Sequence, residues 1–238
     1  MTKLTTIGLD ADDTLWHNEK HFHFTQGIFT DLLKDHAASD KIADRLLKAE
    51  KKNLAFYGFG VKGFTLSMIE TAIEITDGKV PSSTLKTILD AGRDMLHHPL
   101  ELLPHVSETL EILAQNHGLV LITKGDLFDQ ERKVAASGLG DFFSAIEIVS
   151  DKQPATYARI FKQMGAPPEQ ALMAGNSLKS DVIPALHAGA FGVHIPHEFI
   201  WAHEHAEMPN HPRFRTIENI RLLPEFVRSL GAGDYNPR

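Results

Sequence analysis

The sequence predicts an α/β fold with a helical insertion. Short apolar runs alternate with segments of helical periodicity along most of the chain, as expected for a parallel sheet whose strands are joined by helices. Residues 17–98 break this alternation, because they hold helical patterns and no strand-like run. Reactive side chains also follow the apolar runs, at the sheet edge where open α/β folds bind ligands. The predicted strands are residues 5–9, 119–123, 145–150, 171–177 and 191–195.

Helical periodicity places the helices between these strands. Residues 107–115, 130–137, 154–164, 182–188 and 222–230 are the predicted helices of the alternating part. In the insertion, apolar residues three or four apart, such as Ile42, Leu46 and Leu47, predict four helices over residues 29–36, 41–54, 65–76 and 83–96. Turn and capping residues, including Asp77, Gly78 and Pro81, separate the last two of them.

Three carboxylates follow the first predicted strand. Asp10, Asp12 and Asp13 come directly after an apolar run, where a buried strand ends. Ionised side chains this close repel one another, so the cluster requires a cation, a shared proton or a transferred anionic group to compensate it. A solvated acidic turn is the alternative interpretation, and the downstream motifs weigh against it.

Four motifs in a definite order resemble those of the haloacid dehalogenase superfamily of phosphohydrolases. They are Asp10-x-Asp12-x-Thr14, Thr123 followed by Lys124, Lys152, and the run from Asn176 to Asp181, each at a predicted strand end. The resemblance implies a Rossmann-like doubly wound parallel sheet as the core, formed by residues 1–16 and 99–238. Residues 17–98 resemble the family's α-helical cap domain of the first type, which closes over the site and selects the substrate.

The resemblance also assigns roles. Asp10 is the expected nucleophile that forms an aspartyl phosphate, and Asp12 is the expected general acid and base. Thr123, Lys124 and Lys152 are expected to bind the phosphoryl group, with Thr123 and Lys152 counted as catalytic. The expected cofactor is Mg²⁺, held by the metal ligands Asp10, Asp12 through its backbone carbonyl, Asn176 and Asp181.

Two positions depart from the commoner family pattern. Asn176 stands where most members have Asp, and an amide oxygen carries no formal charge, so weaker metal binding is expected. Lys124 stands where many members have Asn and adds a positive charge.

The acid at position 12 separates two branches of the family. Dehalogenase members lack an acid there, so the sequence predicts a magnesium-dependent phosphatase that acts on a small phosphorylated metabolite. A phosphomutase of the same superfamily and a catalytically idle phospho-ligand-binding protein remain the alternatives, since fold alone does not fix function.

The composition of the chain argues against some classes of binding partner and indicates a cellular location. The 238 residues are 42% hydrophobic and 23% charged, with a net charge of −7, which argues against general affinity for nucleic acid or anionic membrane. Without cysteine, disulfides and thiolate chemistry are excluded. No apolar stretch approaches the length of a membrane span, and the amino terminus lacks a basic segment leading into an apolar signal core, so a cytoplasmic location is expected. The expected oligomeric state is a monomer or a homodimer.

Two further features favour structural interpretations. Gly58-Phe59-Gly60-Val61-Lys62-Gly63 matches the glycine fingerprint of dinucleotide-binding proteins, but a helical segment precedes it instead of a strand. We interpret it as a bend between cap helices, with contact between Lys62 or Phe59 and the substrate as an alternative. The histidine-rich segment 194–211 mixes Pro and Glu with its histidines and is predicted to be a solvated surface loop rather than a second metal site.

Overall fold

The computed structural model describes residues 4–232, which form two compact units. The first unit contains residues 4–17, 100–124 and 131–232, and the second contains residues 18–99 and 125–130. The predicted boundaries after residues 16 and 98 lie one residue from the observed junctions. The short segment 125–130, which the sequence assigns to the core, clusters with the helical unit.

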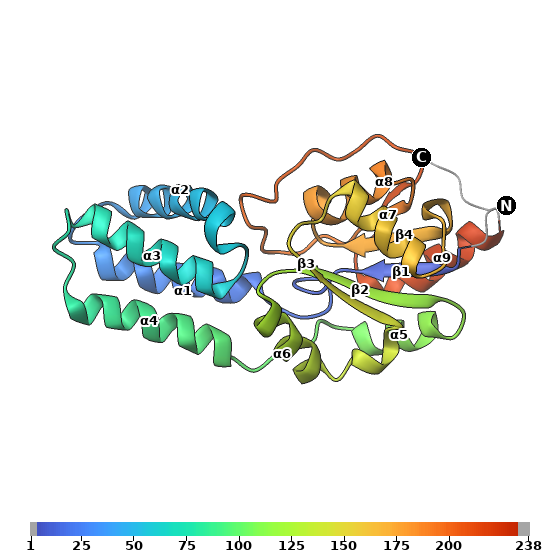
Figure 1. Cartoon of the computed structure of the whole chain (residues 1–238), viewed down its shortest axis with the longest axis horizontal. Helices are drawn as coiled ribbons and strands as arrows, with labels where there is room; N and C mark the ends of the chain where they lie inside the picture. Colours follow the sequence, from blue (N-terminus) through green and yellow to red (C-terminus); the bar gives the residue numbers. More distant parts are fainter. Residues whose placement is uncertain (1–3, 233–238) are drawn as a thin grey trace. The chain divides into compact units, whose positions relative to one another are not determined.

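The first unit is built on a six-stranded parallel sheet (Figure 1). Its strands are β1 (Thr6–Leu9), β2 (Gly118–Lys124), β3 (Ala145–Val149), β4 (Ala171–Gly175), β5 (Phe191–His194) and β6 (Phe214–Thr216). They lie in the order β3-β2-β1-β4-β5-β6, and every pair is parallel. The order reverses beside β1, which is the topological switch point where such sheets bind ligands.

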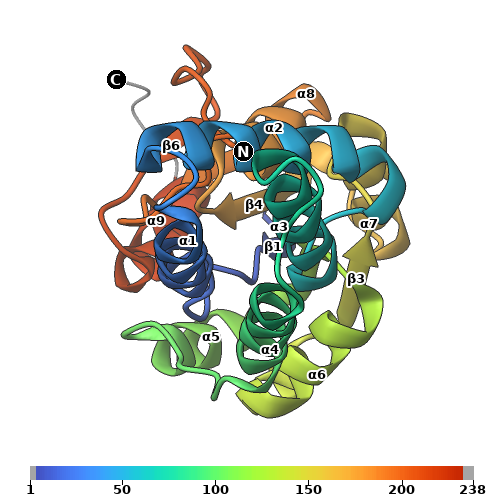
Figure 2. The same cartoon turned by 90° about the vertical axis from the view of Figure 1, so that its left-hand side faces the viewer.

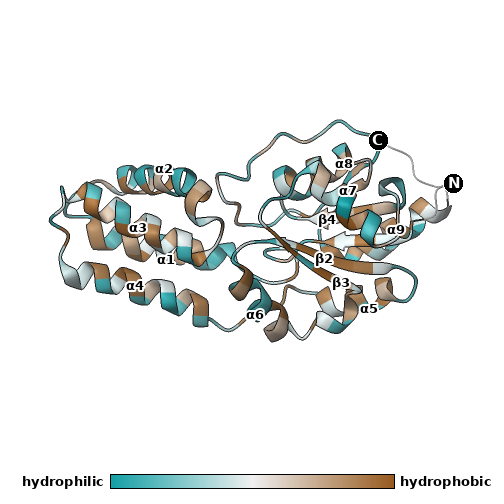
Figure 3. Ribbon diagram, viewed as in Figure 1, coloured by the Kyte–Doolittle hydropathy of each residue, from teal (hydrophilic) through white to brown (hydrophobic). Residues whose placement is uncertain are grey.

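Helices cover both faces of this sheet, which confirms the doubly wound α/β core. They are α5 (Val106–Ala114), α6 (Leu127–Ser137), α7 (Pro154–Gln163), α8 (Ile183–His187) and α9 (Leu223–Ala232). Successive residues of β2 alternate between the faces: Leu119 and Leu121 pack in the cluster with α5 and α9, whereas Val120 and Ile122 pack with α7 and α8. Both faces are therefore apolar, and β2 is coloured as strongly hydrophobic in Figure 3.

Residues 18–99 of the second unit form four helices, as predicted. They are α1 (Glu19–Leu33), α2 (Ser39–Tyr57), α3 (Val61–Ile75) and α4 (Ser82–His97). Figure 2 shows these four helices beside one another. Their buried apolar side chains, among them Phe29, Ile42 and Met68, form a core of their own. Helix α1 begins well before the predicted residue 29, because residues 19–28 already follow the helical pattern with Phe22 packed against the core.

The glycine motif forms the turn between α2 and α3. Gly58 and Gly60 have φ values of 68° and 117°, a region that residues with a Cβ rarely adopt. A helix precedes the motif, so the structure agrees with a bend between helices and lacks the strand that dinucleotide binding requires. Lys62 binds Asp126 with Nζ–Oδ distances of 2.9 and 3.0 Å and lies over the Phe128 ring.

Within residues 4–232, none of the helices is long and apolar enough to span a membrane.

Candidate active site

The sheet brings the predicted motifs to one edge. Asp10 follows β1, Thr123 is near the end of β2, and Asn176 follows β4, the neighbour of β1 on its other side. Thr123 is buried, in register with Ile148 of β3. Because parallel strands end at the same edge, residues more than 160 positions apart in the sequence meet here, as the Thr14 hydroxyl and the Asn176 N–H do.

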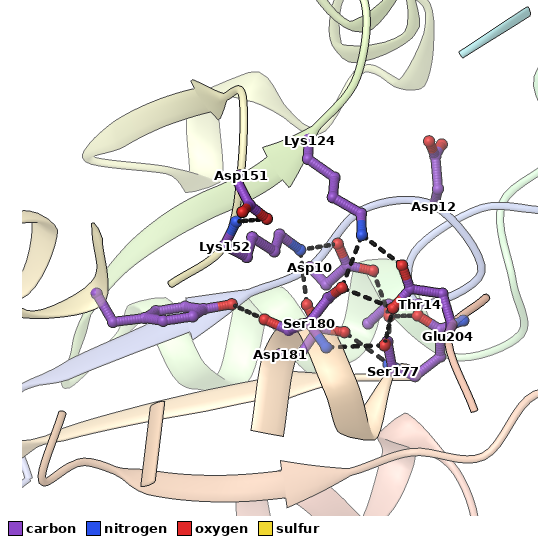
Figure 4. A network of polar contacts seen from close by, with 12 residues as sticks. Asp10, Asp12, Thr14, Lys124, Asp151, Lys152, Ser177, Ser180, Asp181 and Glu204 are labelled. Carbon is purple, nitrogen blue, oxygen red and sulfur yellow. Dashed lines mark hydrogen bonds and ion pairs between the residues drawn. The ribbon is translucent and has the colours of Figure 1, made fainter. Parts of the chain in front are cut away.

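Lys152 joins two carboxylates at the centre of the site (Figure 4). Its ammonium donates to Asp10 Oδ1 and, at 2.6 Å, to Asp181 Oδ1, and all three side chains are buried. Burial and the neighbouring Asp181 raise the pKa of Asp10 to about 7 despite the opposing effect of Lys152. For Lys152, burial lowers the pKa, but attraction to both carboxylates outweighs it and raises the pKa. One ammonium thus binds two buried acids.

The turn at η3 holds Asp181 in this position. Residues Leu178–Val182 form a π-helical turn, and the Ser177 N–H donates to Asp181 Oδ2 at 2.9 Å. A Cβ on Gly175 would lie 2.3 Å from the same Oδ2, so only glycine at the end of β4 allows the carboxylate to pack there.

Thr14 links the first and fourth motifs. Its hydroxyl donates to Asp10 Oδ2 at 3.0 Å, accepts from the Asn176 N–H at 3.1 Å and lies 3.4 Å from Asn176 Oδ1. The Asp10 carboxylate and the Asn176 amide oxygen therefore share one hydroxyl as a neighbour.

The three acids after β1 have separate partners, and these partners reduce the electrostatic repulsion that the sequence suggests. Asp10 binds Lys152, whereas Asp12 accepts from Lys133 Nζ at 2.9 and 3.1 Å and from Trp16 Nε1 at 2.7 Å. Asp13 has a left-handed φ of 61° and places Oδ1 at 3.6 Å from His197 Nδ1. In Figure 4 the Asp12 carboxylate points away from the cluster around Asp10. Sequence reasoning missed Lys133, which lies on α6 and has no motif signal.

A further carboxylate, Glu204, enters the site from the segment between β5 and β6. It accepts from Lys124 Nζ, from Ser177 Oγ and, at 2.6 Å, from Ser180 Oγ. The Lys124 ammonium also donates to Ser180 Oγ at 2.7 Å. Only 12% of the Glu204 side chain is exposed. The segment was predicted to be solvated, and at Glu204 this is wrong, because Lys124, Ser177 and Ser180 donate to the carboxylate inside the site.

His194 also departs from the prediction that the histidine-rich segment is a solvated surface loop. It ends β5 and is buried, with Nε2 at 3.1 Å from the Asn176 carbonyl oxygen. Burial is the main cause that lowers its pKa. The first histidine of the segment therefore supports the fourth-motif loop from inside the fold.

The charge of Glu204 gives a testable pH dependence of stability. Burial raises its pKa, but the attraction of Lys124 and the hydrogen bonds from Lys124, Ser177 and Ser180 prevail and lower it from 4.5 to about 2. An acid with a lowered folded-state pKa stabilises the fold above its ordinary pKa and loses that contribution as the pH falls. The free energy of unfolding is expected to fall between pH 4.5 and about 2 more steeply in the parent than in Glu204→Gln.

Urea denaturation across this pH range checks the prediction. The difference in unfolding free energy between parent and variant should be greatest above pH 4.5 and shrink toward pH 2. A difference that stays constant over the whole range would contradict the assigned pKa shift.

Comparison with known proteins decides the family. The family model of haloacid dehalogenase-like hydrolases matches residues 4–189. The chain belongs to this family. A haloacid dehalogenase-like hydrolase from Xanthomonas campestris is 39% identical over 97% of this chain and 93% of its own, with a TM-score of 0.87. No protein with curated annotation matches the chain significantly.

Solved structures of lower sequence identity also share the fold of the present chain. A predicted phosphoglycolate phosphatase from Haemophilus somnus is 20% identical, covering 95% of this chain and 99% of its own with a TM-score of 0.63. A proposed HAD-hydrolase from Bacillus subtilis, bound to magnesium, is 15% identical over the same shares, with a TM-score of 0.65. Haloacid dehalogenases are also among the similar structures. Proteins described as a predicted phosphatase and as dehalogenases thus share this fold, so the fold alone does not distinguish the two reactions.

Proposed function

We propose that this hydrolase is a magnesium-dependent phosphatase that acts on a small phosphorylated metabolite through an aspartyl phosphate. The buried Asp10 carboxylate, held between the Lys152 ammonium and the Thr14 hydroxyl, carries the proposal. These two donors fix one oxygen each, which orients the carboxylate as a nucleophile. Asp12, two residues away, supports phosphate chemistry over dehalogenation, because only an oxygen leaving group requires a proton.

Each step of the proposed reaction uses a named side chain. An Asp10 oxygen attacks phosphorus, the bond to the ester oxygen breaks, and Asp12 protonates the departing alkoxide. Asp12 then takes a proton from water, whose oxygen attacks phosphorus and releases inorganic phosphate from Asp10. For this role the Asp12 side chain exchanges its contacts with Lys133 and Trp16 for the leaving oxygen. Thr123, Lys124 and Lys152 are the proposed partners of the phosphoryl oxygens.

The oxygen donors at the end of β1 and β4 suit Mg²⁺. The proposed ligands are the Asp10 carboxylate, the Asp12 carbonyl and the Asn176 amide, with Asp181 contributing from η3. Among the residues that the structure describes, no three His, Asp or Glu side chains gather as a metal site of their own. The proposed set does not need such a group, because two of its oxygens come from a carbonyl and an amide. Bound Mg²⁺ supplies positive charge that stabilises the transferred phosphoryl group.

Phosphate release from an aryl phosphate, with and without Mg²⁺, tests the proposal. The expected result is turnover that requires Mg²⁺, followed by a preference within a panel of sugar phosphates, nucleoside monophosphates and flavin mononucleotide. Chloride release from 2-chloropropionate without phosphate release would contradict it and favour dehalogenation. Absence of both activities, with tight binding of a phosphorylated compound, would favour the idle binding protein.

The Asn176→Asp variant tests the metal ligands. Adding a carboxylate beside Asp10 is expected to lower the Kd of Mg²⁺ by about tenfold, because Mg²⁺ binds anionic oxygens more tightly than amide oxygens. Isothermal titration calorimetry measures this directly. The exposed Asn116→Asp adds the same charge elsewhere and should leave the Kd unchanged. An unchanged Kd in Asn176→Asp would remove Asn176 from the ligand set.

A further inference from the structure

Glu204, which lies outside the four motifs, is hydrogen-bonded to residues of two of them. Its carboxylate accepts from Lys124, at the end of β2, and from Ser177 and Ser180, beside Asn176 in the fourth motif. Figure 4 shows these side chains converging on one side of Asp10. The carboxylate oxygens thus bind an ammonium and two hydroxyls, and Glu204 is ionised, with a pKa of about 2.

The charges around the fourth motif explain what this carboxylate does. Asn176 is uncharged and so contributes no negative charge beside Asp10, and Lys124 places one positive charge against Ser180 of the same motif. Lys124 is only 16% exposed and reaches Ser180, so its charge lies within the site and solvent screens it weakly. The uncharged Asn176 and the positive Lys124 both disfavour binding of a divalent cation, whereas Glu204 adds one negative charge at the same place.

We propose that Glu204 sets the divalent-cation affinity of the site by cancelling the charge of Lys124 beside Asn176. The inference rests on the proposed magnesium dependence and adds a residue that no motif contains. Removing the Glu204 charge leaves the Lys124 ammonium uncompensated close to the metal ligands. Repulsion between the ammonium and Mg²⁺ then weakens binding, whereas removing both charges restores it.

A purely structural role makes a different prediction. If Glu204 only fixed the loop through Ser177 and Ser180, its loss would disturb the fourth motif whether or not Lys124 carried a charge. A double-mutant cycle separates the two roles, because it measures how far the effect of one substitution depends on the other.

The experiment measures Mn²⁺ binding by electron paramagnetic resonance, in the absence of substrate. The proteins are the parent, Glu204→Gln, Lys124→Met and the double variant. Glu204→Gln is expected to raise the Kd about tenfold or more, and the double variant is expected to return close to the parent value. Glu198→Gln, an exposed acid of the same segment, is the matched control and should keep the parent Kd. Circular dichroism confirms that each variant is folded before titration.

Two results would overturn the inference. One is an unchanged Kd in Glu204→Gln, and the other is an equal weakening in the presence and absence of the Lys124 charge. Failure of the proposed phosphatase function can be distinguished from failure of this inference, because the parent protein itself would then bind no Mn²⁺ or release no phosphate. Metal binding by the parent with no response to Glu204→Gln rejects the role of Glu204 alone.

Discussion

Asp10→Asn is expected to lower phosphatase kcat/KM by at least about 10³-fold, because an amide oxygen is a poor nucleophile and cannot form the acyl phosphate. The substitution keeps the shape of the side chain and its contact with Thr14 Oγ1. It also removes one of the two acids that share Lys152, so the fold should remain stable. Steady-state assays with an aryl phosphate and an alkyl phosphate measure the loss.

The matched control for this prediction is Asp141→Asn. Asp141 is exposed in the turn after α6 and lies outside the site, so the variant should retain parent activity. Parent-like activity in Asp10→Asn itself would exclude Asp10 as the nucleophile.

Lys152→Met is expected to reduce both activity and stability. The ammonium is buried between Asp10 and Asp181, so its removal leaves two buried like charges without a cation. Breaking a buried ion pair in this way typically costs about 3–5 kcal/mol. The phosphoryl group also loses its proposed cation, and kcat/KM should fall by at least about 10³-fold. Urea unfolding and the phosphatase assay measure the two effects.

A second substitution separates charge from packing. Adding Asp181→Asn to Lys152→Met removes one of the two unpaired acids, so part of the lost stability should return, whereas activity should not. Lys162→Met, at an exposed position of α7, controls for the loss of a lysine and should be near neutral. If Asp181→Asn restored no stability, repulsion between the acids would not be the cause.

The sequence predicted the structure best where the apolar periodicity of a segment agrees with the geometry of a parallel sheet. Five of the six strands and the four helices of the second unit follow from apolar periodicity, because burial imposes it on every such element. The meeting of Asp10, Lys152 and Asp181 follows from the rule that parallel strands end at one edge. The catalytic roles of these residues stay predictions until the variants are measured.

Contacts made by irregular segments could not be predicted in the same way. Glu204 lies 80 residues from Lys124 in a segment without periodicity, and only the folded loop places it against the site. The contact between Lys133 and Asp12 could not be predicted for a different reason, since Lys133 is one of several charged residues on the regular helix α6. Strand β6 has only three residues, too few for an alternating pattern to show.

The central claim is that Asp10 becomes covalently phosphorylated, and acid quenching of the enzyme during turnover tests it most directly. Borohydride reduction of the quenched protein converts an aspartyl phosphate to homoserine, which peptide mass spectrometry locates. We predict homoserine at position 10 in the parent and none in Asp10→Asn. Rapid phosphate release with an unmodified position 10 under the same conditions would contradict the account.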